Sequence, residues 1–401
     1  MNRVELLSPA GNFEKMQVAF AFGADAVYLG GKNFSLRSFS GNFTLDEIAE
    51  AVDYAHARSK KIYVTINIFP HEDDLKDLPD FLRHLDSIKV DGILVADLGI
   101  FSLARKIVPN LKIHISTQAN VTNSLSAKMW KNLGASRIVL ARELSFEEIQ
   151  KIKTDVDIEI EMFVHGAMCL SYSGRCYLSS YLTNRDANRG SCSQPCRWKY
   201  FLMEETRPGE YFPVDEDERG TFILNSKDLC LLPRLDDILK LGIDSLKIEG
   251  RMKSVNYVAG VTKIYRQAID KFYSNPENFS IDQSWLDELE KVSHRPYTTG
   301  FTFDDEKSMQ VYDSSSYVRD SEFLGVVRNF KDGFAIIEQR NRFKIGDEIE
   351  FFQPTRPSFS MQIEDIFDEE DHRVDVANKV QQILKIKTNQ AVEEFSILRK
   401  I

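Results

Sequence analysis

The chain lacks the features that would place it in a membrane or direct it to export. None of its apolar runs approaches the roughly 20 residues of a membrane span. The start, MNRVELLSPAGN, has neither the apolar segment nor the cleavage site of a secretory signal. We therefore expect a cytoplasmic protein that does not associate with membranes.

An excess of positive charge is also missing. The 51 Lys and Arg residues stand against 61 Asp and Glu, a net charge of −10, which excludes nucleic-acid binding through overall charge but not through a local basic surface. Hydrophobic residues make up 43% and charged residues 28% of the chain, which excludes collagen-like and disordered proteins. There are only five cysteines, and without an export signal we do not expect a disulfide framework.

Eight short, largely apolar runs alternate with helical patterns over the first 275 residues. The runs are 4–8, 26–30, 61–67, 92–96, 112–117, 137–141, 158–164 and 245–249. Near-continuous apolar runs are typical of strands buried on both faces. Eight such units in this length match a (β/α)8 barrel of about 250 residues. An open doubly wound sheet would alternate too, but no glycine-rich fingerprint follows the first run. The sequence therefore predicts an α/β fold with a TIM-like barrel.

Helices are predicted between these runs, at 12–22, 97–107, 122–133 and 253–272. Another begins at Thr44, where Glu47 three residues later completes a capping box.

Two segments interrupt the alternation. Residues 165–226 are far too long for a simple connection from strand to helix, which usually takes two to six residues. From Phe323 onward, short strands separated by turn signals predict a small all-β barrel module. We therefore expect a barrel at 1–275 with a cysteine-rich insertion at 165–226, a connecting segment at 276–322 and the β-module at 323–401.

Four of the five cysteines lie in the insertion: Cys169, Cys176, Cys192 and Cys196. Four thiolates so close in sequence can converge on one metal centre, since soft sulfur donors bind zinc or iron–sulfur clusters. A zinc ribbon pairs its cysteines in two tight knuckles, and only the second pair here is that tight. The spacing favours a [4Fe–4S] cluster, with zinc as the alternative. Cys230 lies apart on a predicted helix, and we expect it in the core.

The residues around these cysteines resemble the signature of the collagenase-like peptidase family U32. The similar stretches include EMFVHGAMC at 161–169, SGRCYLS at 173–179, NRGSCSQPCRW at 188–198 and KIEGRMKS at 247–254. Others are LLSPAGN at 6–12 and HISTQANVTN at 114–123. The resemblance covers residues 1 to about 300 and extends to the terminal module.

The resemblance implies an RNA-modifying enzyme. Branches of the family resemble oxygen-independent hydroxylases that carry a four-cysteine [4Fe–4S] cluster, and the layout here resembles most the branch that makes 5-hydroxyuridine at the tRNA wobble position. It implies tRNA as partner and prephenate as a small carboxylate cosubstrate, and an additional protein partner stays open. Hydroxylation of another RNA or of a quinone ring, peptidase activity and a non-catalytic iron–sulfur scaffold remain alternatives. Against a peptidase, neither HExxH nor GxSxG occurs.

Polar residues follow the ends of the predicted strands, where TIM barrels carry their active sites. A small dicarboxylate requires bidentate cations, which arginine supplies best. The predicted substrate-binding residues are Arg37, Asn67, Gln118, Arg142 and Arg251. The predicted catalytic residues are Glu143, Glu249 and His165, the last as a proton carrier. Salt-bridge roles for the two acids and a structural role for His165 fit the sequence equally well.

Residues 169–199 carry five basic side chains against the single acid Asp186. Tyr172, Tyr177, Tyr181 and Trp198 are interleaved with them, a mixture that stacks bases and holds phosphates. The predicted RNA contacts are Arg175, Arg185, Arg189, Arg197 and Lys199. Alternatively, these aromatic residues pack around the cluster and the arginines pair with acids. A second, weaker basic set lies in the β-module: Arg328, Lys331, Arg340, Arg342 and Lys344.

Overall fold

The computed structural model describes residues 3–32, 34–35, 42–169, 171–197, 227–303 and 321–400. It also describes four two-residue strands, β8 (Leu202–Met203), β9 (Tyr211–Phe212), β10 (Glu216–Asp217) and β11 (Gly220–Thr221). Within these described parts, no helix has the length and apolar character that crossing a membrane would require.

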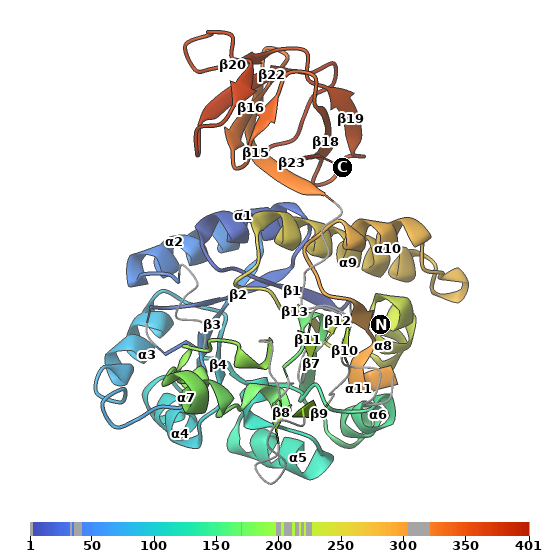
Figure 1. Cartoon of the computed structure of the whole chain (residues 1–401). Helices are drawn as coiled ribbons and strands as arrows, with labels where there is room; N and C mark the ends of the chain where they lie inside the picture. The colour runs from blue at the N-terminus through green and yellow to red at the C-terminus, as the bar shows by residue number, and fades with distance from the viewer. Residues whose placement is uncertain are drawn as a thin grey trace.

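Eight parallel strands close into a barrel, which confirms the predicted TIM-like fold (Figure 1). Closure is shown by β13, which pairs with the first strand on one side and with β7 on the other. The strands are β1 (Glu5–Pro9), β2 (Ala26–Gly30), β3 (Lys61–Ile66), β4 (Gly92–Val95), β5 (Ile113–Ile115), β6 (Arg137–Val139), β7 (Glu159–Ala167) and β13 (Ser245–Ile248).

Helices surround this barrel as an outer ring (Figure 1). They are α1 (Phe13–Ala21), α2 (Leu45–His56), α3 (Leu78–Ser87), α4 (Leu98–Ile107), α5 (Ser124–Leu133), α6 (Phe146–Asp155), α8 (Leu235–Leu241) and α9 (Val255–Ser274). The capping box at α2 is confirmed, since Thr44 and Glu47 each accept a hydrogen bond from the other's backbone N–H. The periodicity therefore predicted the ends of α1, α4, α5 and α9 to within two residues.

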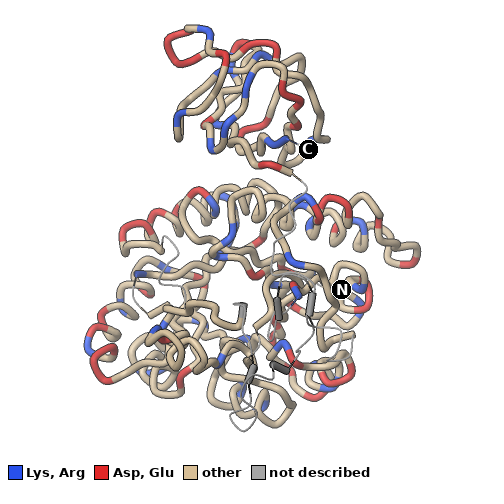
Figure 2. Tube along the Cα trace, viewed as in Figure 1, with Lys and Arg blue, Asp and Glu red and all other residues tan. Residues whose placement is uncertain are grey.

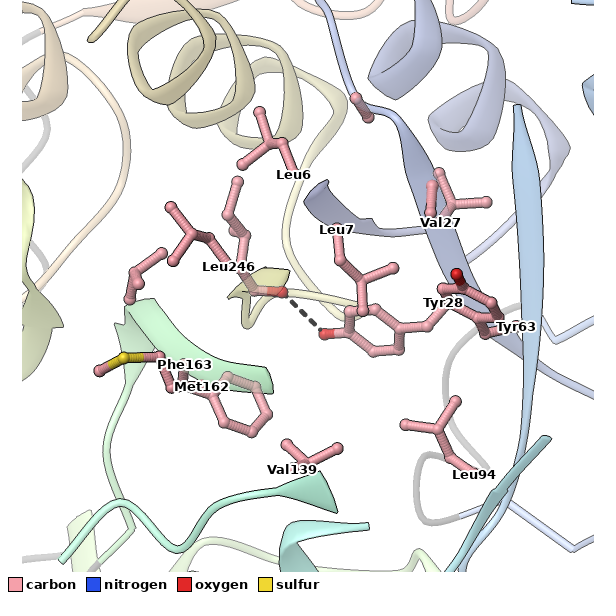
Figure 3. Packing of buried hydrophobic residues seen from close by; sticks show 14 of the residues in the cluster. Leu6, Leu7, Val27, Tyr28, Tyr63, Leu94, Val139, Met162, Phe163 and Leu246 are labelled. Carbon is pink, nitrogen blue, oxygen red and sulfur yellow. Dashed lines mark hydrogen bonds between the residues drawn. The ribbon is translucent and has the colours of Figure 1, made fainter. Parts of the chain in front are cut away.

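The inside of the barrel is filled in two layers. Toward the mouth lie Tyr28, Leu94, Val139 and Phe163, and the Tyr28 hydroxyl donates to the Ile248 carbonyl at 3.0 Å (Figure 3). Leu6 and Leu246, on the alternate positions of their strands, face the helices instead (Figure 3). This is the two-residue alternation of a strand.

The lower layer is a buried network of charges. Arg137 donates to Glu5 at 2.6 Å and to Glu161 at 3.1 Å, and Lys247 donates to the other oxygen of Glu161 at 2.8 Å. The Tyr63 hydroxyl donates to Glu5 at 2.8 Å. Burial alone would raise the pKa of Glu5, but the charge and hydrogen bond of Arg137 hold it below its ordinary value of 4.5.

Strand β7 fixes both ends of the cysteine-rich insertion. Its last residues pair antiparallel with β12 (Asp228–Cys230), where Asp228 lies opposite Ala167. The insertion therefore leaves the barrel rim and returns to it at adjacent positions. It contains α7 (Leu178–Thr183). Cys230 is buried as predicted, but it lies on strand β12, so the helix predicted there is wrong.

The described part of the expected connecting segment packs on the barrel. Helix α10 (Gln283–Glu290) contacts α9, and its Trp285 and Leu289 belong to the barrel core. Strand β14 (Tyr297–Thr298) extends the barrel sheet by pairing with β12, and α11 (Gly300–Phe303) follows it.

The C-terminal residues form the predicted all-β module, with a hydrophobic cluster of its own. Its strands are β15 (Glu322–Lys331), β16 (Phe334–Gln339), β17 (Phe343–Lys344), β18 (Glu348–Phe352), β19 (Phe359–Gln362), β20 (Ile366–Phe367), β21 (Val376–Ala377), β22 (Ile383–Lys387) and β23 (Ile397–Lys400). Seven of them form one sheet in the order β19-β18-β23-β15-β16-β22-β20. The acidic loop after β20 lies at the end of the module away from the barrel (Figures 1 and 2).

The module packs against α1, α9 and α10 through apolar and ionic contacts. Phe22 and Phe352 stack at 5.5 Å between ring centres. Arg399 is fully buried and donates to Glu288 at 2.5 and 2.8 Å and to Glu350 at 2.5 Å. These contacts bury a bidentate ion pair at the boundary, which fixes the position of the module on the barrel.

We predict that Arg137→Ala lowers the free energy of unfolding by about 3–5 kcal/mol, because the buried carboxylates of Glu5 and Glu161 would lose the cation that they share. Urea denaturation at neutral pH measures this loss. The matched control is Arg83→Ala, whose ion pair with Asp80 is exposed and should contribute less than about 1 kcal/mol.

The same network predicts a pH dependence. Because the pKa of Glu5 is lowered on folding, its contribution is present above about pH 4.5 and is lost as the pH falls through the lowered value. Equal losses of unfolding free energy in the Arg137→Ala and Arg83→Ala variants at neutral pH would contradict this account of the buried charge network.

Candidate active site

Two adjacent cavities lie at the mouth of the barrel. The larger, about 1020 Å³, is lined by all four insertion cysteines. The smaller, about 60 Å³, lies inside the mouth and is lined by Asn67 and Arg251 among others. Gln118, Arg142 and Glu249 line both. The structure thus brings the predicted metal ligands and five of the predicted mouth residues to one place, although they come from strands spread over the whole barrel.

The first cysteine loop, which carries Cys169 and Cys176, is held by the carboxylate of Glu143. Its two oxygens accept from the backbone N–H of Ser173 at 2.5 Å and from the Ser173 hydroxyl at 2.7 Å. The adjacent Gly174 has φ +83°, and a Cβ there would meet the Gln118 amide at 2.9 Å, so only glycine fits. Arg175 completes the attachment by donating to the Gln118 carbonyl at 2.7 Å. Glu143 lines neither cavity, and its described role is to position Cys169 and Cys176.

The second cysteine loop, which carries Cys192 and Cys196, is attached to the segment after β3. Arg189 donates to both carboxylate oxygens of Asp74, at 2.6 and 3.0 Å. This hydrogen bond lowers the pKa of Asp74. Asn188 joins the two cysteine loops, since its side chain accepts from the Cys176 N–H at 3.3 Å and donates to the Cys176 carbonyl at 3.0 Å.

The cysteine cavity offers soft donors suited to a metal centre. Desolvation of the sulfur raises the pKa of the Cys169 thiol although the residue as a whole is exposed, whereas the nearby positive charge of Arg142 lowers it. Cys169, Cys176, Cys192 and Cys196 all line this one cavity. The Gln194 N–H donates to the Cys192 sulfur at 3.4 Å. No group of three metal-binding side chains within the described residues has the geometry to hold one ion as it stands. The donor set itself fits a sulfur-ligated cluster or zinc.

Two residues that line the small cavity have polar atoms without a partner among the described residues. Arg142 donates to the Ala167 carbonyl at 2.8 Å and stacks on Phe163 at 3.9 Å, but no described acceptor meets its buried Nε. No described carboxylate pairs with Arg142. Asn67 donates to Ser116 at 3.3 Å, whereas its buried Oδ1 accepts from no described donor. A donor and an acceptor left open at one cavity suit a polar, anionic ligand.

Sequence reasoning missed Lys247, which also lines the small cavity. Its ammonium group pairs with Glu161 and lies 4.4 Å from the centre of the Tyr28 ring. Burial lowers its pKa. The signal was present in the sequence, because Lys247 is two residues before Glu249 and therefore lies on the same face of the strand.

Arg251 is buried beside this cavity and holds the segment after β2. It donates to Ser35 at 2.6 Å, to Thr65 at 3.3 Å and to Asn42. Gly30 allows this approach, since a Cβ there would lie 2.5 Å from the guanidinium. Arg37 falls outside the described residues, and so its predicted role stays a prediction.

His165 lines neither cavity. Simple alternation along β7 would place it on the inner face with Glu161 and Phe163, but the pairing of β7 with β13 shifts by one residue before His165. This bulge turns the ring outward, where it packs among Tyr257, Tyr265 and Tyr297. Burial lowers the pKa of His165 to about 3. The described geometry favours a structural role over the predicted proton carrier.

The predicted RNA contacts have different environments. Arg175 and Arg185 are exposed, whereas Arg189 is half-buried against Asp74. Arg197 lies in a short 3-10 turn, but its side chain is not described, and Lys199 lies outside the described residues.

Three aromatic rings of the insertion are exposed to solvent. Tyr172, Tyr177 and Tyr181 have exposed fractions of 51%, 73% and 75%. They do not pack into the core, and such rings suit base stacking.

In the module, Arg328 and Arg340 both pair with Glu14 and Glu338, so these two cations of the second basic set serve the contact with the barrel.

Comparison with known proteins covers nearly the whole chain. Residues 11–311 match the model of peptidase family U32, and residues 319–399 match the model of the peptidase family U32 C-terminal domain. A Bacillus subtilis tRNA hydroxylation protein is 44% identical over 99% of this chain and 94% of its own length. An Escherichia coli tRNA hydroxylation protein is 39% identical over 88% and 87%. An E. coli 23S rRNA 5-hydroxycytidine synthase is 36% identical over 79% of this chain and 48% of its own length.

We predict that Glu143→Gln makes the half-buried Cys176 more accessible in metal-free protein. Loss of the charged hydrogen bonds to Ser173 should destabilise the loop by about 1.5–3 kcal/mol, and so accelerate thiol labelling by about tenfold or more. The rate of reaction with an aromatic disulfide reagent measures this. Glu147→Gln is the control, since Glu147 is an exposed acid in the first turn of α6, close to Glu143 in sequence. Equal labelling rates in the two variants would remove Glu143 from this role.

Proposed function

The chain belongs to peptidase family U32, and from this premise we propose that it hydroxylates RNA, with wobble uridine in tRNA as substrate and 5-hydroxyuridine as product. The observation that carries the proposal is the junction of the two cavities. A set of four thiolates and a polar, anion-binding barrel mouth share Gln118, Arg142 and Glu249. The similar proteins of B. subtilis and E. coli are named for tRNA hydroxylation, which supports the choice of tRNA.

In this proposal Cys169, Cys176, Cys192 and Cys196 hold a [4Fe–4S] cluster. When bound, such a cluster supplies a centre that accepts and donates single electrons without oxygen. The chain prepares the site through its own contacts. Glu143 and Asn188 hold the two loops that carry the thiols, and the charge of Arg142 offsets part of the thiolate charge at Cys169.

The small cavity is the proposed site of a carboxylate cosubstrate, for which prephenate is the candidate. Arg142 has an unused Nε–H to offer a carboxylate, and Lys247 adds a second positive charge at the floor. The open Oδ1 of Asn67 suits a hydroxyl donor on the same ligand. A hydroxylated dicarboxylate has both kinds of group. As described, 60 Å³ is smaller than such a ligand, so part of it would extend past Arg142 into the cysteine cavity.

The target base would enter the cysteine cavity from the insertion side. A nucleotide acted on by an enzyme must leave its stack, and aromatic side chains take over the stacking. Tyr172, Tyr177 and Tyr181 are exposed on the same segment of the insertion as the cavity-lining residues Cys176 and Leu178. Arg175 and Arg185 are exposed on the same segment and can hold phosphates.

The function is tested by complementation of a bacterial strain whose own U32 genes are deleted and whose tRNA lacks 5-hydroxyuridine. Mass spectrometry of tRNA nucleosides should show that the wild-type chain restores the modification. We predict that Arg142→Ala and Cys192→Ala leave it at the level of the deletion strain, while iron is retained in the first variant and lost in the second.

Cys230→Ala is the matched control, because this thiol is buried in β12 away from both cavities. It should restore the modification. Full modification by Arg142→Ala would contradict the assigned site, and unmodified tRNA with the wild-type chain would contradict the function.

A further inference from the structure

The large cavity is basic although the chain is acidic. The described residues that line it include five basic side chains and two acidic ones, in a protein of net charge −10. A wall of one sign inside a cavity raises the local concentration of ligands of the other sign. The occupant is therefore an anion, and a cavity of about 1020 Å³ has room for more than a small carboxylate.

Part of this basic lining comes from the C-terminal module. Phe323, Arg340, Asn341 and Lys400 line the same cavity as the four cysteines. The module cannot be an independent appendage, since the buried Arg399–Glu288 pair and the stacked Phe22 and Phe352 fix it on the barrel. The cavity therefore has a cysteine side on the insertion and a basic side on the module.

The basic side chains differ in their availability. Arg340 is held between Glu14 and Glu338, and Lys291 lies 3.3 Å from Glu288 and is largely shielded. Lys400 is different, since its side chain is 43% exposed and has a single described ion pair, with the largely buried Asp347 at 2.8 Å. An ammonium group has three donors, so the exposed side of Lys400 can contact a phosphate while this pair stays in place.

We propose that the module is the phosphate-binding wall of the active site, and that the backbone of the RNA next to the target nucleotide lies against Lys400 and Asn341. This inference rests on the proposed function. The target base then faces the cysteine side, where the exposed tyrosines lie. Asn256 adds a further polar group, because it lines the cavity and its buried Oδ1 has no partner among the described residues. A ribose hydroxyl is the kind of donor it would accept.

RNA fits these observations better than an acidic peptide. A nucleotide combines a phosphate for the basic wall, a hydroxyl donor for Asn256 and a flat base for the tyrosine side. An acidic peptide supplies only the negative charge. The cavity and the exposed tyrosines of the insertion together thus offer a partner for each part of a ribonucleotide.

The test is fluorescence anisotropy of a labelled, unmodified tRNA transcript at several salt concentrations. Each phosphate contact contributes about 0.7–0.9 to the slope of log affinity against log salt. We predict that Lys400→Ala lowers the slope by about this amount and weakens binding, and that Lys400→Glu weakens it further. Asn341→Ala should weaken binding with little change of slope.

The control is Lys387→Ala, because Lys387 is an exposed lysine of the same module that does not line the cavity; this variant should bind as the wild type does. Equal effects of Lys400→Ala and Lys387→Ala would overturn the inference while leaving the proposed function standing. If polyglutamate at matched charge displaced the tRNA, the module would be a binding surface for acidic peptides, and the inference would be overturned too. A wild-type chain that binds no tRNA would overturn the proposed function and this inference together.

Discussion

The architecture of the site depends on the way strand β7 ends. Its first part closes the barrel against β13, and its last residues pair antiparallel with β12. Gly166 makes this possible, because its φ of +113° is in the left-handed region and a Cβ would lie 2.5 Å from the Glu249 carbonyl. The long insertion thus starts and ends at adjacent points of the rim. Its cysteines are held at the barrel mouth by the hydrogen bonds of Glu143 to Ser173 and of Arg189 to Asp74.

The charged floor of the barrel gives this mouth its electrostatics. Glu5 and Glu161 face Arg137 and Lys247 in the interior, so the two acids and two bases balance. Lys247 is shared between this network and the small cavity. A ligand carboxylate would therefore meet a cation already oriented by Glu161, with no cost for ordering it. Polar groups fixed in advance by a rigid barrel are the usual way in which this fold positions chemistry.

Much of the fold could be read from the sequence because its signals are local. Apolar runs gave all eight barrel strands, and the Thr44–Glu47 capping box gave the start of α2. The features that were missed depend on long-range pairing. The helix predicted at Cys230 is a strand because β7 and β14 both hydrogen-bond to that segment. His165 faces outward because of a β-bulge in β7, which the two-residue alternation of the sequence does not reveal.

The candidate site was predictable to a similar extent. The ends of parallel strands converge, so Asn67, Gln118, Arg142, Glu249 and Arg251 could be expected at one mouth, and they line one cavity. The sequence does not show which arginines form ion pairs within the protein and which are available to a ligand. Arg189 pairs with Asp74, more than a hundred residues away, and Arg340 pairs with Glu14 across the boundary of two units. The module likewise contributes to the cysteine cavity only because it packs against the barrel, and this packing is not visible in the sequence.

The central claim is that the four insertion cysteines form one iron–sulfur centre above the barrel mouth. The most direct measurement is the iron, acid-labile sulfide and zinc content of the anaerobically purified chain. Our account predicts about four iron and about four sulfide per chain, with a brown colour that is lost when Cys192 is replaced by alanine. A colourless protein with one zinc per chain would contradict it and make the cysteines a structural site.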